Sequence, residues 1–74
     1  MATDLAVGKA MRRLEALEAN NLVAFIDVLL VKWINGTGHE VVIHPTQGGT
    51  TRSGVRDTFP SAVDAALKAW EGRG

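Results

Sequence analysis

The chain has 74 residues, no cysteine, and eight basic side chains against eight acidic ones, while 46% of its residues are hydrophobic. The length predicts one small domain over residues 1–74, with frayed ends at 1–3 and 72–74. The absence of cysteine excludes disulfide bonds and cysteine-based zinc sites. A net charge of zero also disfavours nucleic-acid binding, because such binding draws much of its affinity from neutralised phosphates.

The first residues, Met1 to Asp4, lack the basic and apolar regions of a secretory signal. The longest apolar run, residues 22–34, is interrupted by Asp27 and Lys32. It is shorter than the roughly 20 apolar residues that a membrane span requires. We therefore expect a cytoplasmic protein with no membrane partner, which the absence of cysteine also fits.

Residues 4–20 have the pattern of an amphipathic helix that Thr3 caps. Its predicted buried stripe consists of Val7, Ala10, Met11, Leu14 and Leu17. Three basic residues cluster on the side that we expect to face water: Lys9, Arg12 and Arg13.

Residues 22–34 (LVAFIDVLLVKWI) fit two kinds of element. As a helix, they would run from an Asn21 cap to Gly36. As a strand, they have the β-branched character typical of a sheet, and Asn35-Gly36 follows as a hairpin turn. The short, β-branched segment 39–44 after that turn favours the strand, because the two segments can pair.

Residues 50–59 are expected to form a third, more polar strand, in which Gly54 indicates a bulge or an edge position. A last helix follows, which Ser61 caps and in which Asp64 and Lys68 are spaced for an ion pair. Trp70 belongs to its buried stripe.

The predicted fold is α+β, in the order α-β-β-β-α, with a three-stranded antiparallel meander and both helices on one face. The alternative is α-α-β-β-α, with residues 22–34 helical.

This order resembles the topology of double-stranded-RNA-binding domains. In that family the final helix begins with a lysine-rich stretch that contacts phosphates, whereas residues 61–66 contain no lysine and one aspartate. Residues 54–70 are also similar to small β-β-β-α domains of the HicB antitoxin type, in which a polar strand leads into an alanine-rich helix. Neither resemblance includes signature residues, so no function is transferred.

Few residues are candidates for chemistry. His39 and His44 lie five apart on one strand and should point to opposite faces, so they cannot chelate one metal ion as a pair. Ser53 and Ser61 are the only serines, and no tyrosine or cysteine accompanies them. We expect no enzyme activity, no metal and no cofactor.

The apolar run supplies the main functional hypothesis. If residues 22–34 form a strand, both of its faces are mostly apolar, and the face turned away from the helices meets water unless a partner covers it. We expect a protein–protein interaction module that forms a homodimer and binds another protein. It would act as a regulator, an antitoxin-like partner or an inhibitor from a phage or mobile element. The candidate partner-binding residues are Phe25, Leu29, Val31 and Trp33.

The alternative hypothesis is a nucleic-acid-binding regulatory domain. Its candidate residues are Lys9, Arg12, Arg13, Arg52 and Arg56, on the first helix and the third strand.

Overall fold

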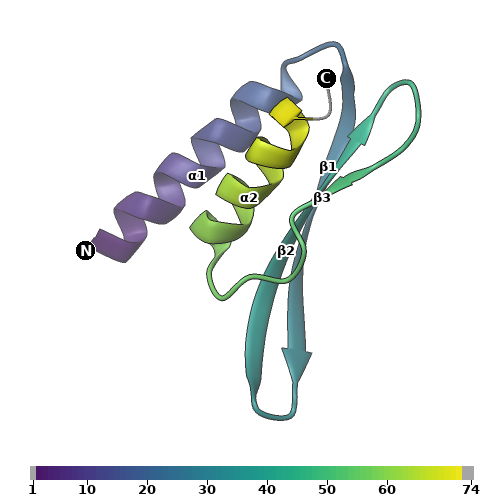
Figure 1. Cartoon of the computed structure of the whole chain (residues 1–74). Helices are drawn as coiled ribbons and strands as arrows, with labels where there is room; N and C mark the ends of the chain where they lie inside the picture. The colour runs from purple at the N-terminus through teal and green to yellow at the C-terminus, as the bar shows by residue number, and fades with distance from the viewer. Residues whose placement is uncertain (1, 73–74) are drawn as a thin grey trace.

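The computed structural model describes residues 2–72, and the side chains of residues 4–72. Two helices flank a meander of three antiparallel strands in the sheet order β1-β2-β3 (Figure 1). The elements are α1 (Ala2–Glu18), β1 (Val23–Trp33), β2 (Gly36–Pro45), β3 (Thr51–Arg52) and α2 (Phe59–Gly72). The predicted α+β class and the order of elements are confirmed.

The apolar run forms a strand, so the helical alternative for residues 22–34 is wrong. β1 pairs with β2 from Val23↔Pro45 to Trp33↔Gly36, with one irregularity between Val23 and Phe25. Ile34 and Asn35 make the turn. Branched side chains suit a pleated sheet, and the adjacent partner strand supplies the hydrogen bonds that a lone strand lacks.

The helices begin earlier than the sequence predicts. α1 starts at Ala2, so Thr3 lies within the helix rather than ahead of it. α2 ends at Gly72. α2 starts at Phe59, and the hydroxyl of Thr58 accepts a hydrogen bond from the Ser61 amide at 3.2 Å. Thr58 is therefore the capping residue and Ser61 is not, because the backbone is already helical at Phe59.

The third strand is much shorter than the predicted segment 50–59. β3 covers Thr51–Arg52, and beyond it one isolated bridge joins His39 to Arg56. Gly54 has a φ of 73°, which turns the chain out of the extended conformation right after the strand. Residues 53–58 thus lead to α2 as an irregular segment.

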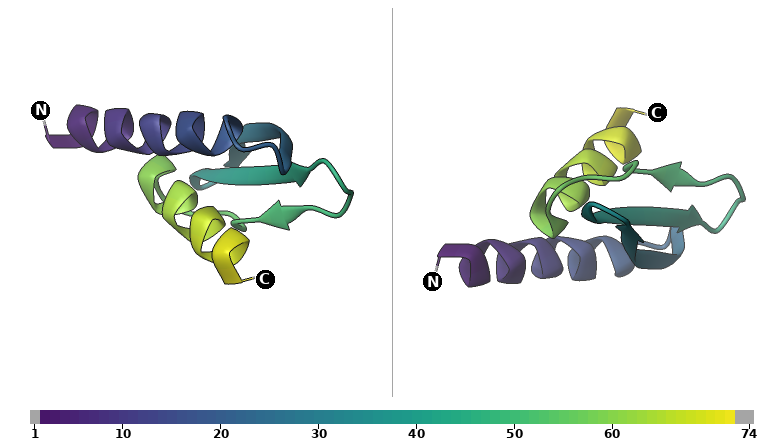
Figure 2. Two further views of the ribbon diagram at one scale, coloured as in Figure 1. Left: turned by 90° about the horizontal axis from the view of Figure 1, so that it is seen from above. Right: turned by 90° about the horizontal axis from the view of Figure 1, so that it is seen from below.

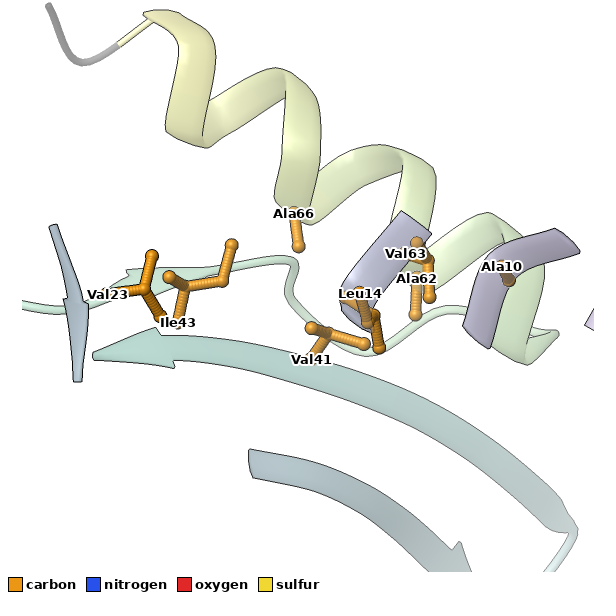
Figure 3. Close-up of a cluster of buried hydrophobic side chains, with 8 residues drawn as sticks. All are labelled: Ala10, Leu14, Val23, Val41, Ile43, Ala62, Val63 and Ala66. Carbon is orange, nitrogen blue, oxygen red and sulfur yellow. The ribbon is translucent and has the colours of Figure 1, made fainter. Parts of the chain in front are cut away.

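Both helices pack on one face of the sheet, as predicted (Figure 2). Val41 and Ile43 of β2 are fully buried and share one cluster with residues of α1 and α2 (Figure 3). The buried cluster consists of Ala10, Leu14, Val23, Val41, Ile43, Ala62, Val63 and Ala66, and Leu17 and Trp70 pack against it. Met11, expected in the buried stripe of α1, is 46% exposed.

The helix layer covers only part of the sheet. The hairpin of β1 and β2 extends well beyond the helices, so its turn end carries no helix on either face (Figure 1). Below, the turn end of this hairpin, defined as residues 28–40, is called the hairpin arm. The sheet face that carries Val41 and Ile43 is called the helix side, and the opposite face is called the open face.

Candidate protein-interaction surface

β1 holds an unusual concentration of large apolar side chains that face water. Phe25 is 54% exposed, Leu30 is 62% exposed and Trp33 is 51% exposed. The strand is also at the edge of the sheet, since the order is β1-β2-β3. The exposed large hydrophobic residues of β1 and its flanks are Leu22, Phe25, Val28, Leu29, Leu30, Trp33 and Ile34. Exposed apolar surface of this kind is typical of interaction sites, so β1 is the candidate surface of this chain.

The four predicted partner-binding residues lie together on the open face. Phe25 is opposite His44, Leu29 is opposite Glu40, Val31 is opposite Gly38 and Trp33 is opposite Gly36. Directly opposed residues of an antiparallel pair point to the same side, and His44 and Glu40 alternate with the buried Val41 and Ile43. All four side chains therefore point away from the helices.

Val55 belongs to the same surface, although no pattern in the sequence pointed to it. It is 48% exposed, and a β-carbon on Gly38 would contact both the Val55 side chain and the Trp33 ring. Trp33 and Val55 thus both approach the small residue Gly38. The strand register, which brings Gly38 opposite Val31, is the signal that places this approach on the open face.

The helix side of β1 is apolar and exposed as well. Val28 is opposite Val41 and is 50% exposed, and Leu30 is opposite His39. The residues predicted from the sequence all lie on the open face of β1, whereas both faces of β1 are exposed in the hairpin arm. The reason is that the helices do not reach the arm (Figure 1).

The backbone of β1 is open along its outer edge. The amide and carbonyl of His39 both bond to Arg56, at 2.7 and 2.8 Å, so they face the segment after β3 and point away from β1. Likewise the Val41 carbonyl accepts from the Ser53 amide and the Val41 amide donates to the Ser53 hydroxyl. In an antiparallel ladder, the residues opposite these, Leu30 and Val28, then direct their own N–H and C=O away from β2.

Two polar pairs interrupt the apolar open face. The His44 ring stacks on Phe25 with centroids 4.0 Å apart, and its Nε2 lies 2.9 Å from a carboxylate oxygen of Asp27. The Arg52 guanidinium donates two hydrogen bonds to Glu40, at 3.0 and 3.2 Å. These bonds with Arg52 lower the pKa of the Glu40 carboxyl, while Glu40 raises the pKa of Arg52.

The basic residues of the alternative hypothesis do not form one surface. Arg52 pairs with Glu40 on the open face, whereas α1 packs on the helix side. Arg56 donates its Nε hydrogen to the Ser53 carbonyl. Lys9, Arg12 and Arg13 do come together, and with Ala6, Ala10 and Pro60 they line a groove of about 590 Å³ between α1 and the start of α2. Arg13 lies 3.5 Å from Asp64, which also pairs with Lys68 at 3.1 Å as predicted.

The residues considered for chemistry have structural contacts. The two histidines point to opposite faces, and no group of three potential metal ligands occurs within residues 2–72. The Ser53 side chain is nearly buried, and its hydroxyl accepts from the Val41 amide and donates to the Gly54 carbonyl. Its oxygen is therefore already engaged in holding β3 against β2.

The comparisons with known proteins add no family. No protein-family model, no curated protein and no solved structure matches this chain. Within the described part of the chain, neither helix combines the length and the apolar character that crossing a bilayer demands. The class that the fold defines is a small α+β domain with an exposed apolar edge strand.

Proposed function

We propose that this chain is a small, non-enzymatic protein–protein interaction module that works as a homodimeric regulator, with β1 as its binding element. The observation that carries the proposal is the exposure of large apolar side chains on both faces of β1, next to an open backbone edge. A cytoplasmic location and a bacterial or phage origin accompany this proposal as expectations from the sequence.

Apolar surface in contact with water is unfavourable in free energy, and association of two copies would bury it. Burial of apolar surface contributes about 25 cal/mol for each Å² removed from water. In the monomer Leu30 is 62% exposed and Trp33 is 51% exposed, so the free energy of burying these side chains is not gained. The zero net charge adds no long-range repulsion between two copies.

A matched pair of leucines tests the proposal. Leu30 on β1 is 62% exposed and Leu5 on α1 is 67% exposed. We expect sedimentation equilibrium to give twice the 7.9 kDa mass of one chain for the unaltered protein at high concentration. Leu30→Glu should weaken the dimer about tenfold or more, since a charge would enter an apolar contact, whereas Leu5→Glu should leave it unchanged.

Two outcomes would contradict the proposal. One is a monomer at every concentration up to the millimolar range. The other is equal weakening by Leu5→Glu and Leu30→Glu, because that result would place the contact away from β1.

The second candidate, nucleic-acid binding, is favoured by one observation only, the groove that Lys9, Arg12 and Arg13 line. It predicts binding to duplex or single-stranded nucleic acid that weakens steeply with salt. Reversing the charge of Arg12 and Arg13 should abolish that binding and leave dimerisation intact. No binding at low salt would remove this candidate.

A further inference from the structure

The open edge and the bare hairpin arm together indicate how two copies meet. We propose that β1 pairs with β1 of a second copy, antiparallel and edge to edge, so that the two sheets form one continuous six-stranded sheet. This inference rests on the proposed function and specifies its geometry.

The first argument is the two-sided apolar character of β1. A strand added at this edge places side chains beside Phe25 and Leu29 on the open face, and beside Val28 and Leu30 on the helix side. The added strand must therefore be apolar on both faces. Within this chain β1 itself has that pattern, so a second copy fits its own edge.

The second argument is the direction of the backbone groups. Val28 and Leu30 direct their N–H and C=O to the outer edge, and no described strand lies there. Natural edge strands are usually shortened, bulged or charged to prevent pairing. β1 is long, and its one irregularity is at the Val23 end. It carries two charged residues: Asp27, whose carboxylate is drawn to His44 of the adjacent strand, and Lys32 beside the turn end of the strand.

The third argument is the position of the helices. They cover the sheet near the Val23 end of β1 and leave the hairpin arm bare (Figure 1). A two-fold axis perpendicular to the sheet keeps all four helices on one side and reverses the strand direction. The covered end of each copy then lies beside the bare arm of the other, where the exposed Leu30 is located.

Edge pairing is also favoured over packing of two open faces against each other. The open face carries the Glu40–Arg52 and Asp27–His44 pairs. Face-to-face packing would remove the exposed Arg52 and Asp27 side chains from water, and this desolvation can cost more than the attraction within the pairs returns. Edge pairing leaves these two charges in water.

The regular part of β1, residues 25–33, is centred on Leu29. Pairing about Leu29 places Val28 opposite Leu30 of the other copy, and Phe25 opposite Trp33 of the other copy. Asp27 is then opposite Val31 of the other copy and Lys32 is opposite Ile26 of the other copy, so no like charges are opposed.

Proline substitution tests the edge directly. Val28→Pro removes an amide that faces the outer edge, whereas Val28→Thr keeps the amide and the branched side chain. We expect Val28→Pro to weaken the dimer about a hundredfold or more by sedimentation, with a folded circular-dichroism spectrum, and Val28→Thr to weaken it less than about tenfold. A dimer that persists in Val28→Pro would overturn the edge pairing and leave the proposed function standing.

Hydrogen exchange of the unaltered chain gives a second readout in case the proline variant does not fold. The Val28 and Leu30 amides should exchange at least about tenfold more slowly at concentrations where the chain is dimeric than on dilution to monomer. The Leu29 amide, which faces β2, should be protected in both. Rapid exchange at Val28 and Leu30 in a proven dimer would refute the edge pairing, and a chain that never dimerises would refute the proposed function itself.

Discussion

The indole of Trp33 lies across Gly38, so that a β-carbon at Gly38 would be only 2.9 Å from Cη2 of the ring and would also collide with the Val55 side chain. A glycine at this position is therefore required by the close approach of two side chains from other segments. The strand register places Trp33 on the open face of the hairpin arm, where it forms part of the candidate surface.

Gly38→Ala is expected to lower the free energy of unfolding by about 1–3 kcal/mol, as overpacking usually does, and to change the fluorescence of Trp33. Chemical denaturation of dilute protein measures the first effect. Gly36→Ala is the control, because a β-carbon there would lie 3.6 Å from the same ring, an ordinary contact. Equal destabilisation by both substitutions would contradict the crowding at Gly38.

Gly8→Ala should raise the free energy of unfolding, in contrast to Gly38→Ala. Gly8 lies within α1, and a β-carbon there would approach only the flexible end of Arg12, at 3.7 Å. Alanine loses less backbone freedom than glycine on entering a helix, so we expect a stabilisation of about 0.5–1 kcal/mol. Thermal unfolding of the two proteins at equal concentration checks this, and a lower melting temperature for the variant would show that α1 is strained at Gly8.

Thr58→Ala should destabilise α2. The Thr58 hydroxyl accepts the Ser61 amide, and loss of such a cap costs about 0.5–2 kcal/mol. Ser61→Ala is the matched control, since Ser61 lies inside the first turn of α2 and is exposed. Urea denaturation should separate the two variants, and a larger loss from Ser61→Ala would return the capping role to Ser61.

The choice between Thr58 and Ser61 as the cap of α2 could not be predicted from the sequence. Thr58 and Ser61 both precede an apolar helical pattern, and Phe59-Pro60 between them suits either the end of a strand or the start of a helix. Proline is accepted in the first turn because its missing amide is not needed there. Only the backbone conformation at Phe59 decides between the two caps.

The candidate surface could be predicted only in part from the sequence. Alternation along a strand is local, so Phe25, Leu29, Val31 and Trp33 could be assigned to one face from their spacing alone. The exposure of Val28 and Leu30, and the approach of Val55 and Trp33 to Gly38, depend on how far the helices reach and on the register of the sheet. Those are tertiary properties, and no periodicity in the chain encodes them.

The Glu40–Arg52 pair predicts a dependence of stability on pH. Hydrogen bonds from Arg52 hold the pKa of the Glu40 carboxyl below its ordinary value of 4.5. A carboxyl whose pKa is lowered by folding contributes stability above its unfolded pKa, and this contribution is lost as the pH falls through the lower folded pKa. The chain should therefore lose stability progressively as the pH falls below about 4.5.

Glu40→Gln should be less stable than the unaltered chain at pH 7, and the difference between the two should shrink as the pH falls below 4.5. Some acid sensitivity should remain in the variant, because Lys68 and Arg13 lower the pKa of Asp64 in the same way. Urea denaturation from pH 7 down to pH about 3 measures both effects, with Glu15→Gln on the exposed side of α1 as the control. A constant difference between Glu40→Gln and the unaltered chain across this range would mean that the ion pair with Arg52 contributes no net stability, and that Glu40 acts on the fold through packing alone.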